Sequence, residues 1–207
     1  MTNRREFFNK AAETWDKRFE STELANFLSQ LVPKFNLKSG QRVLDVGTGT
    51  GLLIPFLVKA VGPTGHVTAV DYAEKMVEIC KTKYAGISNV SISVKRVENL
   101  DFPSKSFDAV TCFGLFPHLE KKEVALTQLN RVLKPGGKLI IAHALSSSEI
   151  KAHHSTASAV VHDALPDRKE MKRFLKQLGF NGIKITDKPG CYFCLSTTHQ
   201  VAQTQKL

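Results

Sequence analysis

The chain has 207 residues, a formal net charge of +10 and a hydrophobic fraction of 42%. A chain of this length is expected to form one α/β domain, because two independent domains would each have a very small core. No uninterrupted apolar run approaches about 18 residues, so no membrane-spanning helix is predicted. Residues 1–10 are polar and lack the apolar stretch of a secretory signal, which predicts a cytoplasmic protein.

The basic excess is spread along the chain and forms no long block of like charges. This distribution favours a solvated basic surface over a dedicated nucleic-acid site. Nucleic acid is therefore not the expected partner, and both a monomer and a homodimer remain open.

The first 40 residues are predicted to be helical. Leu24, Phe27, Leu28 and Leu31 have the i, i+3, i+4, i+7 spacing of one buried stripe. From residue 41, short apolar strands alternate with helices. The predicted strands are 42–46, 66–70, 90–94, 107–112 and 138–142, and the predicted helices are 52–60, 74–84 and 121–133. Pro55 is expected either to kink the first of these helices or to confine its regular part, and residues 135–137 are expected to form a tight turn.

This alternation predicts βαβ units and a parallel sheet. After a break at residues 143–165, a helix is expected from Pro166, followed by strands near 182–187 and 191–197. Because four residues join these two strands, they should form an antiparallel hairpin. The predicted fold is α/β, a Rossmann-like doubly wound sheet of seven strands, mostly parallel with a C-terminal antiparallel hairpin strand. One domain is expected, with a helical cap (1–40), a cofactor-binding core (41–142), a His-rich lid (143–166) and a C-terminal helix and hairpin (167–207).

A glycine-rich turn follows the first predicted strand, with the sequence Gly47-Thr48-Gly49-Thr50-Gly51. Glycine permits positive φ and close approach of a ligand, and a helix N-terminus offers free N–H groups. The second strand ends in Asp71, where a carboxylate can accept both hydroxyls of a ribose. Leu52 occupies the third glycine position of a dinucleotide fingerprint, which weighs against a nicotinamide cofactor.

Four segments in order carry a family resemblance: 43–51, 69–71, 106–110 and 133–139. They resemble the class I S-adenosylmethionine-dependent methyltransferases. Residues 8–16 also resemble the N-terminal helix of the small-molecule branch that is related to quinone-biosynthesis methyltransferases. The resemblance implies S-adenosylmethionine as the cofactor, S-adenosylhomocysteine as its product, and a small-molecule methyl acceptor.

The resemblance also implies roles for individual residues. Those expected at the methionine end of the cofactor are Asp45, the loop residues Gly47, Thr48, Gly49 and Gly51, and Phe113 beside the sulfonium. Those expected at the nucleoside are Asp71 on the ribose and Tyr72, Met76, Val97 and Glu98 around the adenine. Arg96 stands where many relatives carry an Asp for the adenine amino group, so Glu98 or a backbone group must take that role.

Methyl transfer is an in-line displacement, in which orientation can supply about 7–11 kcal/mol and a general base roughly 3–5 kcal/mol. His118 and His143 follow the fourth and fifth predicted strands and are the candidate catalytic bases. Residues 112–115 lack the motif of amine-directed nucleic-acid methyltransferases, which favours a small-molecule acceptor. The alternatives are an RNA methyltransferase and a non-catalytic module that binds S-adenosylmethionine.

The segment 143–166 is rich in histidine, and imidazole is a common ligand of transition metals. His143, His154 and His162 are candidate metal ligands. If the segment were helical, His154 and His162 would lie two turns apart, about 12 Å along the axis, which is too far for one ion unless the helix breaks. A polar lid with incidental histidines is the alternative, and it is the favoured interpretation.

Overall fold

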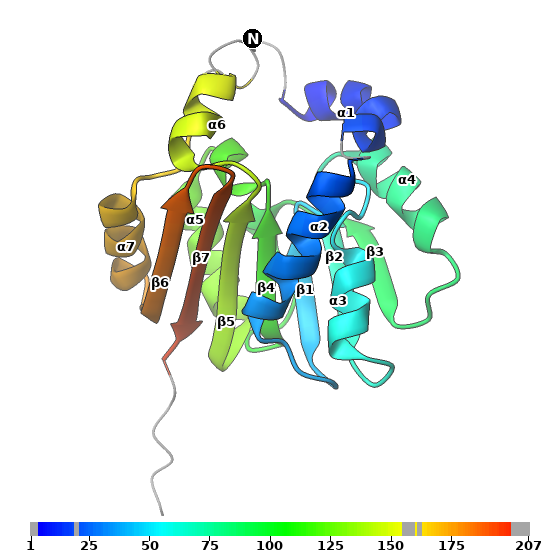
Figure 1. Cartoon of the computed structure of the whole chain (residues 1–207). Coiled ribbons are helices and arrows are strands. Elements are labelled where there is room, and N and C mark those ends of the chain that lie inside the picture. The colour runs from blue at the N-terminus through cyan, green and yellow to red at the C-terminus, as the bar shows by residue number, and fades with distance from the viewer. Residues whose placement is uncertain (1–3, 19–20, 155–159, 161–162, 200–207) are drawn as a thin grey trace, which may run out of the picture.

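The computed structural model describes residues 4–18, 21–154, 160 and 163–199. Its centre is one seven-stranded sheet with the order β3-β2-β1-β4-β5-β7-β6 (Figure 1). The strands are β1 Arg42–Val46, β2 His66–Asp71, β3 Val90–Val94, β4 Phe107–Phe113, β5 Leu133–His143, β6 Phe180–Lys188 and β7 Cys191–Thr198. Strands β1 to β5 pair in parallel, whereas β7 is antiparallel to both β5 and β6. The predicted fold class is confirmed.

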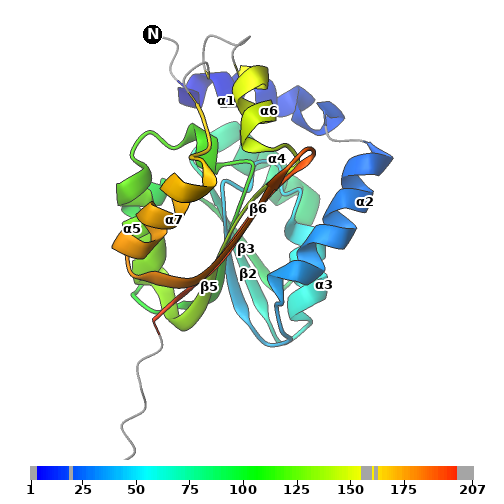
Figure 2. The same ribbon diagram turned by 60° about the vertical axis from the view of Figure 1, so that its left-hand side comes forward.

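Helices cover both faces of the sheet (Figure 2). The helices are α1 Arg4–Trp15, α2 Thr22–Leu31, α3 Ile54–Val61, α4 Glu74–Tyr84, α5 Lys122–Val132, α6 Ser147–His154 and α7 Arg168–Gln177. Short 3-10 helices are η1 Asp16–Arg18, η2 Val32–Phe35, η3 Val97–Asn99 and η4 Phe116–His118. Helices α2 and α3 lie on one face, and α5 and α7 lie on the other. Within the described residues, no helix has the length and apolar character needed to cross a membrane.

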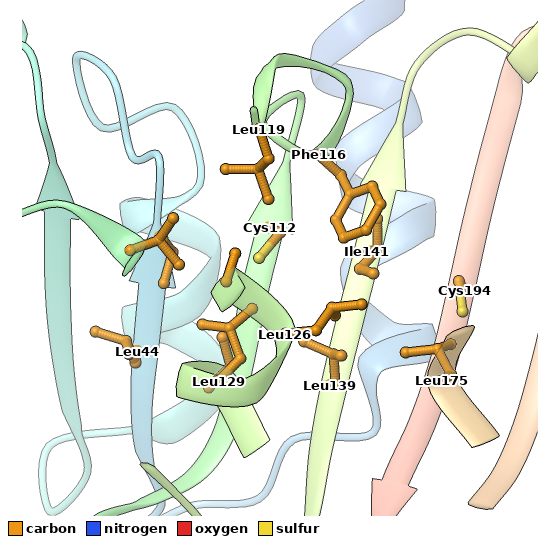
Figure 3. Close-up of a cluster of buried hydrophobic side chains, with 14 of the residues drawn as sticks. Leu44, Cys112, Phe116, Leu119, Leu126, Leu129, Leu139, Ile141, Leu175 and Cys194 are labelled. Carbon is orange, nitrogen blue, oxygen red and sulfur yellow. The ribbon is translucent and has the colours of Figure 1, made fainter. Parts of the chain in front are cut away.

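Each face of the sheet has its own hydrophobic core. Figure 3 shows Leu126 and Leu129 of α5 and Leu175 of α7 beside Leu139 and Ile141 of β5. On the opposite face, residues of α2, η2 and α3 pack on the alternate side chains of the strands, including Leu28, Leu31, Phe35, Leu57, Val43, Val67 and Ile140. The central strands are apolar on both faces, as parallel strands covered by two helical layers must be.

One local prediction was decided between its two alternatives, and another was wrong. Pro55 confines the regular part of the helix and does not kink it, because α3 begins at Ile54 and Pro55 lies in its first turn, where a missing N–H breaks no intrahelical bond. Residues 135–137 do not form a separate turn. They belong to the irregular start of β5, where the register shifts between the pairs Phe107–Leu133 and Ala109–Lys138.

Helices α1 and α6 lie above the carboxyl ends of the parallel strands, at the top of Figure 1. Helix α1 is tied to α4, because Arg5 and Asn9 both donate to the Glu74 carboxylate. Helix α6 is tied to the β6–β7 hairpin, where the N–H of Ser147 donates to Asp187 and the N–H of Gly190 donates to Glu149. These contacts place two helices over the edge of the sheet where ligands of doubly wound folds bind.

Candidate active site

The glycine-rich turn is anchored to the neighbouring strand. The N–H groups of Gly47 and Thr48 both donate to the carbonyl of Val70 in β2, at 2.8 and 3.1 Å. Gly47 has a φ of 70°, and a Cβ there would lie 2.8 Å from the side chain of Leu115. A residue other than glycine would therefore be strained and would meet the wall of the site.

The surroundings of Gly51 differ from those of Gly47 and Gly49. A Cβ on Gly51 would lie 2.3 Å from the Tyr84 ring, and its carbonyl accepts a hydrogen bond from the Tyr84 hydroxyl at 2.9 Å. Gly51 therefore packs against α4, and it lines neither of the two cavities described below.

Asp71 at the end of β2 is buried and held by backbone donors. Its Oδ2 accepts from the N–H of Gly49 at 2.9 Å, and its Oδ1 accepts from the N–H of Ala73 at 2.9 Å. Burial raises the pKa of this carboxyl, and the backbone hydrogen bonds oppose that shift. Each carboxylate oxygen can accept more than one hydrogen bond, and Asp71 lines the adjoining cavity, which suits a pair of ribose hydroxyls.

A first cavity of about 300 Å³, here called the nucleoside cavity, lies beside Asp71. Tyr72, Met76, Val97 and Glu98 all line it. The Arg96 guanidinium lies 5.5 Å from the centre of the Tyr72 ring and 3.6 Å from the Glu98 carboxylate. The four residues expected around an adenine are thus together in one cavity, with Arg96 at its edge.

A second cavity of about 570 Å³, here called the acceptor cavity, lies on the other side of the glycine turn. Asp45, Thr48, Phe113, His143, His153 and His154 line it together with the apolar side chains Trp15, Leu52, Leu53 and Leu145. The two cavities share Gly47, Gly49, Gly114 and His118. A ligand that spans the glycine turn would therefore have one end in each cavity.

Two residues beside the junction, Asp45 and Thr48 of the acceptor cavity, fit the methionine end of the cofactor. Asp45 is buried, accepts a hydrogen bond of 2.6 Å from the Thr111 hydroxyl, and has its pKa raised to about 6 by burial. The Thr48 hydroxyl is buried without a protein partner among the described residues. An acidic group and an unpaired hydroxyl beside bare backbone can receive an ammonium and a carboxylate.

Histidines from three elements gather above the junction. The rings of His118 in η4 and His154 in α6 lie 5.0 Å apart, and His153 lies 5.9 Å from His154. His143, at the end of β5, stacks 6.4 Å from Phe113. His162 lies outside the described residues. Among the residues that the structure describes, no group of three or more His, Cys, Asp or Glu side chains is arranged to hold a metal ion.

Two residues of this site were missed at the level of sequence. Asp163 accepts from His118 Nδ1 at 2.7 Å and from Arg4 at 2.5 Å, and its side chain is 3% exposed. Arg4 also pairs with Glu120 at 2.7 Å. The sequence separations of 45 and 159 residues follow no local periodicity. The one available signal was that Asp163 follows His162 directly in a His-rich segment.

Comparison with known proteins agrees with this geometry. Residues 43–137 match the model of a family described as a methyltransferase domain. A demethylmenaquinone methyltransferase of Staphylococcus aureus is 42% identical over 112 residues, which are 54% of this chain and 46% of the relative. The chain thus spans about half the length of the curated relatives that it matches.

Solved structures show the same architecture. A SAM-dependent methyltransferase from Aquifex aeolicus is 25% identical with a TM-score of 0.71, covering 87% of this chain and 95% of that one. Phosphoethanolamine N-methyltransferase 2 of Haemonchus contortus, in complex with S-adenosyl-L-methionine, has a TM-score of 0.80 at 16% identity, covering 97% of this chain and 61% of that one. The latter likeness concerns the fold alone.

The sheet order, the glycine turn with Asp71, and the family match together define the class I S-adenosylmethionine-dependent methyltransferases. Residues 43–137 of this chain thus match a methyltransferase domain of this kind.

Proposed function

We propose that this protein transfers the methyl group of S-adenosylmethionine to a small molecule held in the acceptor cavity. The observation that supports this most is the junction of the two cavities at Gly47, Gly49, Gly114 and His118. A cofactor whose ribose lies on Asp71 and whose ammonium lies near Asp45 would have its sulfonium at this junction. The cofactor supplies a methyl group on a good leaving group, so alignment of the acceptor is the main task of the protein.

The chain's own residues divide this task between them. The loop backbone at Gly47, Thr48 and Gly49, together with Asp45, orients the methionine end, and Phe113 closes the wall beside the methyl group. Tyr72, Met76, Val97 and Glu98 enclose the adenine. His118 and His143 both line the acceptor cavity and are the candidates for handling the proton of the acceptor.

The lining of the acceptor cavity indicates the kind of acceptor. Its walls are apolar apart from histidines, Asp45 and Thr48, and no Lys or Arg is among the described residues that line it. We therefore propose an uncharged acceptor with a hydroxyl group on an apolar, ring-like body. A hydroxylated aromatic fits, which agrees with the demethylmenaquinone methyltransferases among the relatives.

The two alternatives from the sequence are less well supported. An RNA methyltransferase needs free cations around the mouth, but the four that line the nucleoside cavity each have a carboxylate partner: Arg4 with Glu120, Arg5 with Glu74, Lys95 with Asp101 and Arg96 with Glu98. A non-catalytic binding module would enclose the methyl group. Here the junction opens into a cavity large enough for an acceptor.

The proposal is tested by calorimetry followed by a methylation assay. S-adenosylmethionine and S-adenosylhomocysteine are each expected to bind with one site per chain. With cofactor carrying a deuterated methyl group, mass spectrometry should find the label on a reduced naphthoquinone or another phenol, and not on RNA. Binding without transfer to any compound of a phenol, thiol and amine panel would support the non-catalytic alternative instead.

Cofactor affinity is expected to depend on pH through Asp45. Its pKa is raised from 3.8 to about 6, so the unliganded carboxyl is largely protonated below pH 6. An ammonium group favours the ionised form, so binding must release this proton, and affinity should fall by up to tenfold for each pH unit below about 6. Calorimetry in two buffers of different ionisation enthalpy checks the proton release. An Asp45→Asn variant should bind more weakly and lose this pH dependence.

A further inference from the structure

His118 and His143 line the acceptor cavity, and their Nδ1 atoms have different hydrogen-bond partners: one partner is an acceptor and the other is a donor. His118 Nδ1 lies 2.7 Å from Oδ2 of Asp163. His143 Nδ1 lies 3.1 Å from the backbone N–H of Leu145, which donates to it. In a neutral imidazole one nitrogen donates a hydrogen bond and the other accepts one. The partner of Nδ1 therefore decides whether Nε2 carries the proton or a free lone pair.

For His118 the partner is an acceptor. Asp163 also receives the guanidinium of Arg4, and these two neighbours lower the pKa of its carboxyl, although burial opposes them. An ionised carboxylate can only accept, so Nδ1 of His118 must carry the proton. The Nε2 atom of neutral His118 then has a free lone pair.

For His143 the partner is a donor. A backbone N–H cannot accept, so Nδ1 of His143 must be unprotonated and its proton must be on Nε2. Burial and the nearby histidines 118, 154 and 153 lower the pKa of His143 to about 4, so the ring is neutral near pH 7. His143 therefore offers an N–H to the cavity and has no free lone pair with which to take a proton.

Asp163 is fixed from several sides. Its Oδ1 receives Arg4 from α1, its backbone carbonyl receives His154 Nδ1 of α6 at 2.8 Å, and its own N–H donates to the carbonyl of Val160 at 2.8 Å. The η4 turn that carries His118 is held in turn by Lys122, whose ammonium donates to the carbonyl of Leu119 at 2.9 Å. The carboxylate thus joins the N-terminal helix, the histidine helix and the loop after β4 at one point.

We propose that Asp163 is the positioning residue that holds His118 in the tautomer of a general base, while His143, in the opposite tautomer, donates a hydrogen bond to the acceptor molecule. This inference rests on the proposed function and assigns separate roles to two histidines that the sequence could not tell apart. It specifies the acceptor further: a protonated nucleophile faces His118, and a second atom able to accept a hydrogen bond faces His143.

The step balances with these groups alone. His118 Nε2 takes the proton of the acceptor hydroxyl as the oxygen forms its bond to the methyl carbon. The carbon–sulfur bond breaks, and its electron pair stays on sulfur. The resulting imidazolium is stabilised by Asp163 and then releases its proton to water.

Several charged or titratable groups surround His118 and enter its pH response. They are Asp163, Arg4, Glu120 and Lys122, together with the other histidines of the cavity, His143, His153 and His154. Asp163→Asn removes one negative charge from this set and offers both a donor and an acceptor to Nδ1. It is therefore expected to destabilise the imidazolium and to move the acid limb of the pH–rate profile to lower pH.

The first test is nuclear magnetic resonance of the ¹⁵N-histidine-labelled full chain at pH 7.5. Long-range ¹H–¹⁵N spectra distinguish the tautomers, and His118→Gln and His143→Phe assign the signals. We expect His118 protonated on Nδ1 and His143 protonated on Nε2. If either ring has its proton on the other nitrogen, the proposal is wrong. This measurement on the unmodified protein needs neither an acceptor nor a stable Asp163 variant.

The second test separates the roles kinetically. Asp163→Asn should lower kcat about 10- to 100-fold with little change in KM. It should also move the acid limb of the pH–rate profile to lower pH. His143→Phe should mainly raise KM for the acceptor. The matched control is Asp167→Asn, which removes a nearby acid at the N-cap of α7 but retains a good capping side chain, and it should behave as the wild type.

The outcomes distinguish this inference from the proposed function. An Asp163→Asn variant with unchanged kcat and pH profile would overturn the positioning role. If the tautomers are as assigned but no acceptor is methylated, the proposed function fails while the assignment of the two rings stands.

Discussion

Replacing Asp71 by alanine is expected to weaken the binding of S-adenosylhomocysteine by about 100-fold or more. The carboxylate lies at the end of β2 with its oxygens positioned by the N–H groups of Gly49 and Ala73. Hydrogen bonds from two hydroxyls to a charged acceptor contribute about 1.5–3 kcal/mol each, so losing both would cost roughly 3–6 kcal/mol. Calorimetry measures the change directly. S-adenosylhomocysteine is the better probe because it reports on binding without turnover.

The Asp71 variant also frees two backbone donors in the glycine turn, so folding must be checked separately. Thermal unfolding without ligand should show a folded protein, and Asp71→Asn, which keeps the shape of the side chain, should lose less affinity than the alanine variant. Glu78→Gln on the exposed side of α4 is the matched control and should bind normally. An Asp71→Ala protein that is folded and binds both compounds as the wild type does would disprove the location of the cofactor.

Replacing His118 by glutamine is expected to lower kcat about 10²- to 10⁴-fold, the usual contribution of a general base. The effect should be largest for acceptors with weakly acidic hydroxyls and should shrink for acceptors that arrive already ionised. The affinity for S-adenosylhomocysteine should change little, although His118 contacts Phe8 of α1 and touches the edge of the nucleoside cavity. Steady-state kinetics over a range of acceptor acidities provides the measurement.

His66→Gln serves as the control for the His118 experiment. His66 lies at the start of β2, at the opposite end of the strand from Asp71, and bonds to Ser91. It should leave kcat and the pH profile unchanged. A His118→Gln protein with wild-type kcat towards a weakly acidic hydroxyl would rule out a base at this position, and alignment of the acceptor alone would then account for the rate.

Much of the cofactor side could be predicted because its determinants are local in sequence. A strand, a glycine turn and a helix follow one another within 20 residues, and the register of a parallel sheet brings the ends of neighbouring strands together. Asp71, 20 residues after Gly51, therefore comes to lie within 2.9 Å of the Gly49 N–H. The structure places Tyr72, Met76, Val97 and Glu98 in the cavity where they were expected.

The same local reasoning left alternatives open, or was wrong, where two conformations share one sequence signal. A proline inside an apolar run indicates either a kink or a helix start, and the burial of Ile54 and Leu57 on the sheet set the start at Ile54. Pro135-Gly136-Gly137 indicates a turn, but pairing with β4 drew it into the strand. The metal interpretation of His143, His154 and His162 gains no support within the described residues, and a monomer, a homodimer and the cytoplasmic location stay predictions.

By itself, the sequence determined the order of strands and helices, the glycine turn and the class of cofactor, and it predicted Asp71 as the acid that holds the ribose. These depend on periodicity and on spacings of a few residues, which backbone geometry converts directly into position. Only the tertiary structure decided the chemistry of the histidines. The tautomer of each ring depends on one partner atom, and for His118 that atom belongs to Asp163, 45 residues away, held in turn by Arg4 from the first helix. Such contacts arise from packing between distant segments, which no local pattern specifies.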